Sequence, residues 1–213
     1  SLVPPAGFVS SFRTFESEMP LYSDDEIKQI ITDPGRVPMR RVFASEWITD
    51  QKSHGSCNGF AGAAALSKAR WLRGIRDKLI LSGAFLYSLI NSGRDNGSAL
   101  EDGLRAVQST GICPALLVGW DAIYPKQQPT NAKSEAAKHK GLKCYAVQTK
   151  QGFRSALAAG FPVIVAVQAG SNFQRLNSQG IAGVDSGGGN HAIHSYDIEI
   201  IGGKEYYLTD NSW

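Results

Sequence analysis

One short segment, residues 51–61, restricts the possible folds more than any other part of the chain. It reads QKSHGSCNGFA and continues into an alanine-rich run that predicts a helix over residues 57–74. Cys57 then lies on the first turn of that helix, where unpaired N–H groups and the positive end of the helix dipole favour a thiolate. The small residues of the run suit a helix buried between two lobes. Gln51 places an amide donor one loop before the thiol.

A nucleophilic thiol needs a base, and His191 is the strongest candidate among the four histidines. His139 lies in a charged stretch typical of a solvated surface, and His54 is too close to the thiol in sequence to be more than a predicted loop side chain. His191 instead follows a glycine-rich run and opens residues 191–201, whose alternation predicts a strand. Period-two geometry puts His191 and His194 on opposite faces, so only one of them can face the thiol.

A second strand, predicted over residues 205–208 after a Gly-Gly turn, returns beside the first and carries Asn211 toward the His191 end. The asparagine side chain can accept a hydrogen bond from an imidazole N–H. That bond fixes the ring orientation and the tautomer while the other ring nitrogen faces the thiol. Trp213 is then placed to shield the bond from water, where it would be weaker.

In these segments the chain resembles the papain-like cysteine peptidases, and in particular their bacterial-type members. The resemblance lies in residues 51–61, 190–193 and 211–213, in the family's order of glutamine, cysteine, histidine and asparagine, and it extends from about Val37 to the end. It implies an α+β, two-lobed papain-like fold, in which an active-site cleft separates a helical lobe from a β-barrel-like lobe.

By resemblance, Cys57 is the nucleophile, His191 the base and then the acid, and Asn211 the orienting residue. Gln51 and the Cys57 backbone N–H form the oxyanion hole. The implied activity is that of a cysteine endopeptidase acting on a polypeptide through a thioester, with no cofactor or metal. Three further positions match substrate-binding residues of the family, and they are Gly97, Ala166 and Ala192.

The expected organisation has three parts. Residues 1–35 form an N-terminal extension, either a surface arm or a propeptide remnant; residues 36–120 form the mainly helical lobe; and residues 121–213 form the β-rich lobe with His191 and Asn211. Further helices are predicted over 23–31, 82–90, 98–108 and 152–159, and further strands over 144–148 and 163–168.

The chain departs from the family pattern at several positions. His54 stands where the family has a cysteine that is disulfide-bonded to a nearby loop, and the matching loop, residues 91–98, has no cysteine. Asn58 replaces a bulky aromatic residue and is expected to reshape the primed side of the cleft, and Lys52 replaces a glycine. The sequence stops at Trp213, where the family continues into further strands. We therefore expect a longer polypeptide, or an additional chain or segment that completes the sheet.

Composition excludes some classes of function. A net charge of +3, dispersed along the chain, does not favour nucleic acid or a membrane surface, and no apolar run approaches the length of a membrane span. If Cys57 is a free thiol, Cys113 and Cys144 either pair or are buried thiols, and the compartment is left open. Two alternatives to the endopeptidase remain: a structural or assembly protein that retains a dormant papain-like fold, and an amide hydrolase acting on cell-wall peptides.

Overall fold

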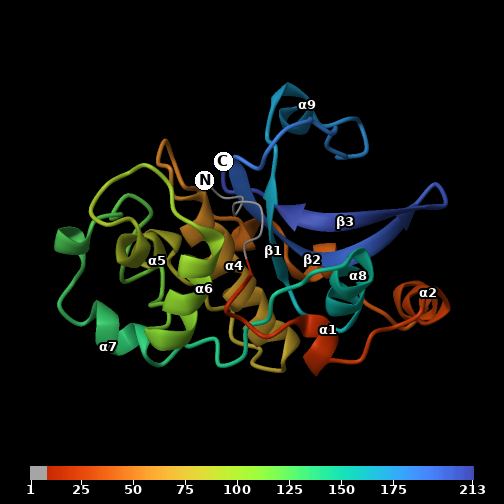
Figure 1. Cartoon of the computed structure of the whole chain (residues 1–213), viewed down its shortest axis with the longest axis horizontal. Helices are drawn as coiled ribbons and strands as arrows, with labels where there is room; N and C mark the ends of the chain where they lie inside the picture. The colour runs from red at the N-terminus through yellow and green to blue at the C-terminus, as the bar shows by residue number, and fades with distance from the viewer. Residues whose placement is uncertain (1–8) are drawn as a thin grey trace.

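The computed structural model describes residues 9–213. Figure 1 shows helices α4 to α7 gathered on one side and a twisted sheet with α8 and α2 on the other. The helices are α1 (Phe15–Glu18), α2 (Asp24–Thr32), α3 (Met39–Val42), α4 (Cys57–Leu72), α5 (Gly83–Ile90), α6 (Leu100–Ser109), α7 (Ala132–Ala136), α8 (Lys150–Ala158) and α9 (Ser171–Gln174). The short 3-10 helices are η1 (Ser45–Trp47) and η2 (Pro125–Gln127), and the strands are β1 (Val163–Val167), β2 (His191–Ile201) and β3 (Lys204–Asp210).

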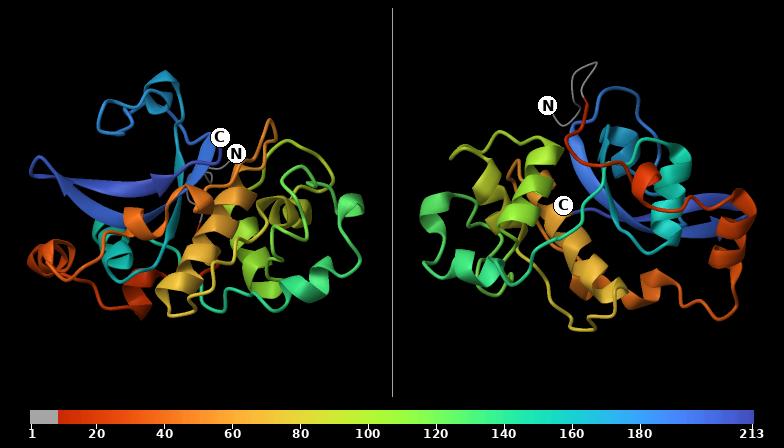
Figure 2. Two further views of the ribbon diagram at one scale, coloured as in Figure 1. Left: turned by 180° about the vertical axis from the view of Figure 1, so that it is seen from behind. Right: turned by 60° about the horizontal axis from the view of Figure 1, so that its bottom comes forward.

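Helix α4 lies between the two halves of the molecule (Figure 2). It packs against α5 on one side and against β2 on the other. Its sequence explains this position, because residues 59–65, all small except Phe60, are buried nearly all round. On the α5 side, Phe60 joins a core with Leu86 and Tyr87, which are fully buried. The thiol at the first residue of α4 therefore lies where the two halves meet.

The sheet described by the structure has three antiparallel strands in the order β1-β2-β3. Its register pairs Val167 with His191 and His194 with Asp210, with a bulge in β2 between Ser195 and Asp197. The predicted hairpin turn is present: Gly202 and Gly203 both have positive φ, 57° and 78°, which a two-residue turn of this kind requires. The β2–β3 hairpin thus delivers residues 211–213 beside the start of β2.

The predicted helices at 23–31, 57–74, 82–90, 98–108 and 152–159 are all present within a few residues of their expected bounds. The N-cap predicted at Ser23 is part of a complete capping box with Glu26. The strand predicted over 144–148 was wrong. This segment forms a single parallel bridge, Thr14 with Ala146, because its only backbone partner there is the N-terminal arm.

Candidate active site

Cys57 begins α4 and is 7% exposed, packed with Ala61 of the same helix and Ala192 of β2. Burial raises the pKa of its thiol, while the backbone N–H groups of Ala192, Asn58 and Cys57 itself act in the opposite direction. Since Ala192 follows His191 directly, the thiol lies against the strand that carries the candidate base. The thiolate form expected at the start of the helix stays a prediction.

His191, 3% exposed, is held on two sides. Its Nε2 lies 2.7 Å from Oδ1 of Asn211, and the Trp213 ring stacks on the imidazole with centroids 4.1 Å apart and planes inclined by 31°. Asn211 Oδ1 accepts this bond, so Nε2 carries a proton and Nδ1 is the nitrogen left to exchange one. Burial lowers the pKa of His191, and the bond to Asn211 opposes this.

Gln51 is 5% exposed, and its carboxamide is fixed at both ends. Its Nε2 donates to the backbone carbonyl of His54 at 2.7 Å, and its Oε1 accepts from Ser212 Oγ at 2.7 Å. An amide nitrogen carries two N–H groups, so one remains for a further acceptor. The backbone N–H of Gln51 also donates to the Ser212 carbonyl at 2.7 Å. The loop before α4 is thereby tied to the segment after β3.

Two polar side chains, His54 and Asp95, occupy the position of the absent disulfide. His54 Nδ1 lies 3.0 Å from Oδ2 of Asp95, in the loop where the family's second cysteine is expected. The same carboxylate accepts from the Gly55 N–H at 2.8 Å and from the Tyr87 hydroxyl at 3.2 Å. Two polar side chains therefore join the two segments that a disulfide would join, and His54 is more than a solvated loop residue.

The segment around Gly97 is held from two directions. Gly97 has φ 83°, and its N–H donates to the Tyr87 hydroxyl at 3.0 Å. Asn58 Nδ2 donates to Ser98 Oγ at 3.0 Å and to the Ala99 carbonyl at 2.6 Å. Asn58 is 1% exposed and braces the segment beside Gly97, and the expectation that it reshapes the primed side of the cleft stays a prediction.

The two predicted pocket alanines are brought together. Ala166 of β1 and Ala192 of β2 are cross-strand partners, and Ile164 packs on the cluster of Ala192 with Cys57. No described contact joins Gly97 to them. The substrate-binding roles of these residues stay predictions. Within residues 9–213 no group of histidine, cysteine and acidic side chains is arranged to hold a metal ion.

Sequence reasoning did not identify Ser212, Asp95 and Tyr87, which fix the candidate groups. Ser212 was visible only as the middle residue of an Asn-Ser-Trp triplet, and neither an isolated aspartate nor a helical tyrosine carries a pattern of its own. All three cysteines are free thiols. Burial raises the pKa of Cys113 to about 12 and that of Cys144 to about 11, so both are poor nucleophiles.

An α+β fold that packs a cysteine at a helix start against the strand carrying a His–Asn pair defines the class: a two-lobed cysteine-protease fold. The family model described as papain family cysteine protease matches residues 34–213, and the chain belongs to that family. None of the curated proteins compared with the chain matches it by sequence.

Solved structures agree on the fold. Xylellain, a cysteine protease from Xylella fastidiosa, matches at 19% identity with a TM-score of 0.57, over 70% of this chain and 65% of that chain. Digestive procathepsin L 3 of Tenebrio molitor larval midgut matches at 17% identity and TM-score 0.66, over 84% of this chain and 62% of that one. A recombinant stem bromelain precursor matches at 20% identity and TM-score 0.70, over 96% of this chain and 66% of that one. This chain spans about two thirds of the length of each of these structures.

Proposed function

We propose that this chain is a cysteine endopeptidase that hydrolyses peptide bonds through a thioester formed on Cys57. The observation that carries the proposal is the bond from His191 Nε2 to Asn211, because it leaves Nδ1 as the ring nitrogen available to the thiol. Ala192, packed on Cys57, places the histidine's own strand against the nucleophile.

In the first half of the reaction, the Cys57 thiol gives its proton to His191 Nδ1, and the sulfur attacks the peptide carbonyl carbon. The carbonyl oxygen becomes an oxyanion, which accepts hydrogen bonds from the free N–H of Gln51 and from the Cys57 backbone N–H. Collapse breaks the C–N bond, His191 returns its proton to the leaving amine, and a thioester remains.

In the second half, His191 removes a proton from water, and the resulting hydroxyl attacks the thioester carbonyl. The C–S bond breaks, the carboxylic acid leaves, and the thiol is restored. Burial raises the pKa of Cys57 and lowers that of His191. We place Ala166 and Ala192 in a pocket for an apolar substrate side chain, and Trp213 over the His191–Asn211 pair.

The test is labelling with an epoxide thiol probe, followed by mass spectrometry to locate the adduct. We expect modification at Cys57, retained in Cys113→Ser and Cys144→Ser and lost in Cys57→Ser and His191→Ala. Cys113, which is buried, and Cys144, which is partly buried, serve as internal controls, since their raised pKa values predict slow reaction.

Two results would contradict the proposal. A folded, reduced protein that takes up no probe at Cys57 would indicate a dormant papain-like fold with a structural or assembly role. Probe uptake together with cleavage of cell-wall peptides, and none of a denatured polypeptide, would indicate an amide hydrolase of different substrate class.

A further inference from the structure

Helix α4 carries a buried lysine, Lys68, three turns beyond Cys57. Lys68 is fully buried, with its ammonium 5.3 Å from the ring centroid of Phe43 and 4.8 Å from that of Tyr196. A charge in such a place is strongly unfavourable unless an opposite charge meets it. Burial lowers the pKa of Lys68, and the carboxylate of Asp210 opposes that shift.

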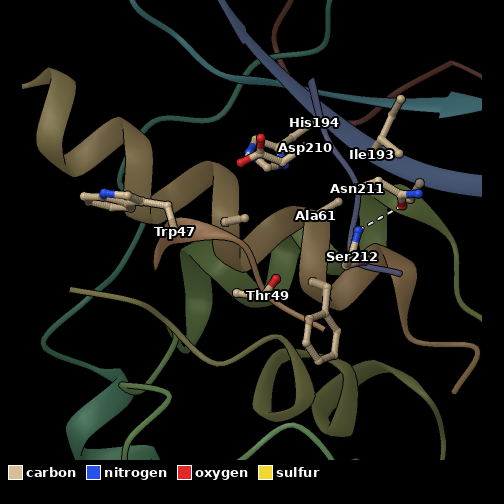
Figure 3. Close-up of a pocket in the computed structure, with 11 residues that line it drawn as sticks. Trp47, Thr49, Ala61, Ile193, His194, Asp210, Asn211 and Ser212 are labelled. Atoms are coloured by element: carbon tan, nitrogen blue, oxygen red, sulfur yellow. Dashed lines mark hydrogen bonds and ion pairs between the residues drawn. The ribbon is translucent and has the colours of Figure 1, made fainter. Parts of the chain in front are cut away.

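Asp210 is that opposite charge: its Oδ2 lies 2.5 Å from Lys68 Nζ. It is the last residue of β3 and is bonded covalently to Asn211, whose side chain orients His191. Figure 3 shows Asp210 and His194 together beside α4, with Asn211 next along the chain. His194, Asp210 and Asn211 line a small cavity together with Ala61 of α4.

His194 completes the arrangement from the opposite face of β2. Its Nε2 lies 3.0 Å from Lys68 Nζ, and in the register of the sheet it is the cross-strand partner of Asp210. Burial, and secondarily the nearby Lys68 charge, hold the pKa of His194 well below its usual value. The ring is therefore neutral, and its Nε2 accepts from the ammonium.

We propose that Lys68 is a positioning residue for hydrolysis, which locks the end of β3 to the thiol-bearing helix and so fixes Asn211 against His191. The inference rests on the proposed function and adds a residue to it. No described contact joins Lys68 to the Cys57 thiol or to the His191 imidazole. Lys68 acts through Asp210, because the buried Lys68–Asp210 ion pair fixes the position of Asp210 relative to α4.

The decisive variants are Lys68→Met, which keeps the length of the side chain, and Asp210→Asn, which keeps its shape. The readouts are the epoxide inactivation rate constant of Cys57 across pH, and the NMR resonance of the His191 Nε2 proton. We expect inactivation to slow roughly 10- to 100-fold, since a misplacement of about 1 Å costs on that order. We also expect the Nε2 proton signal to broaden or disappear.

The matched control is Arg70→Met, which removes the Arg70–Asp77 ion pair from the same helix away from the site and should leave both readouts unchanged. If Lys68→Met proves too unstable to study, Asp210→Asn and the charge-reversed pair Lys68→Glu/Asp210→Lys carry the test. Recovery of the His191 signal in the reversed pair would support the proposal.

Folded Lys68→Met or Asp210→Asn protein with the wild-type rate constant and an unchanged His191 signal would overturn it. Failure of the proposed function has a different signature. In that case the wild-type protein is not labelled at all, while the NMR comparison still reports whether Lys68 positions Asn211.

Discussion

The carboxamide of Gln51 accepts a hydrogen bond from Ser212 at its oxygen and donates one N–H to the His54 carbonyl. The oxyanion stabilisation that we propose for Gln51 therefore has two contributions that can be tested separately. One is the donor itself, and the other is the hydroxyl that orients it. Removing the donor removes a transition-state interaction, whereas removing the hydroxyl loosens a group that is otherwise still present.

We predict that Gln51→Ala lowers kcat/KM by about 100- to 1000-fold, because one oxyanion donor is worth about 3–4 kcal/mol. Ser212→Ala should cost about tenfold, the order expected for the loss of one buried hydrogen bond. Steady-state kinetics on a fluorogenic peptide would measure both. Equal losses in the two variants, or a loss confined to KM, would contradict the assignment of Gln51.

Residue types at motif spacing were enough to select His191 and Asn211, and the hydrogen bond predicted between them is present. Their catalytic roles, with those of Cys57 and Gln51, stay predictions. Asp95 could not be found this way, because it binds His54 across 41 positions of sequence, and only the folded chain brings the two together.

At the scale of elements, the contact between α4 and α5 depends on two glycines. A Cβ built on Gly59 would lie 2.5 Å from the Gly83 carbonyl and 2.9 Å from the Tyr87 nitrogen, and one on Gly83 would lie 2.5 Å from the Phe60 ring. Both are closer than real contacts allow, and the atoms in the way are largely backbone or buried ring. The helices can pack this closely only without side chains there.

Gly59→Ala should therefore destabilise the fold by about 1–3 kcal/mol, the usual cost of overpacking, although alanine is the better helix former. Thermal unfolding would show a fall in Tm of roughly 3–10 °C. Gly119→Ala is the matched control, because its Cβ would meet nothing within 4 Å and its φ is not positive. A Tm for Gly59→Ala at or above that of the control would show that α5 shifts freely to make room.

Elements with a strong local signal were predictable, and those defined by a distant partner were not. In helix α2 the capping residues Ser23 and Glu26 lie close together in sequence, and in the β2–β3 hairpin the turn residues directly join the two strands. Residues 144–148 have strand composition, yet a strand needs a paired backbone along its length. Here the neighbour is an arm whose backbone forms a bridge at Ala146 alone. The additional segment expected to complete the sheet beyond β3 stays a prediction, as does the division of the chain at residues 35 and 120.

At the scale of the whole molecule, the described part of the N-terminal extension runs over both halves. Ser10 and Ser11 bind Glu101 of α6, and Phe15 packs its ring on Tyr145 and Phe161. Directly after this segment, Arg36 pairs with Asp197 of β2.

Between the halves lies a cavity of about 920 Å³, bordered by α4, α6, α8 and β1 and in part by the arm. Whether residues 1–35 form an arm or a propeptide remnant stays a prediction, and residues 1–8 lie outside the described part of the chain. No helix within the described residues is long and apolar enough to cross a membrane.

The carboxylate of Glu101 accepts hydrogen bonds from Ser10 and Ser11 near the start of this arm. Its burial alone would raise the pKa, but hydrogen bonds from Ser11, Ser10 and Arg105 lower it to about 2 from an ordinary value of 4.5. A depressed pKa in the folded state means that the arm's attachment is fully stabilised above pH 4.5 and is lost as the pH falls toward 2. Because the group is near the surface, the effect should release the arm rather than unfold the domain.

We predict that the Ser11 amide, which donates to Glu101 Oε1 at 2.7 Å, is protected from hydrogen exchange at pH 5 and loses that protection between pH 4 and pH 2. Protection factors, corrected for the intrinsic exchange rate at each pH, would measure this directly. In Glu101→Gln the same amide should be less protected at every pH, with no transition, because an amide side chain does not titrate in this range. Two results would contradict this prediction: loss of protection in the wild-type protein already at pH 4.5, or unchanged protection at pH 2 in both proteins. Either result would mean that the arm is fixed by the packing of Phe15 and not by the Glu101 carboxylate.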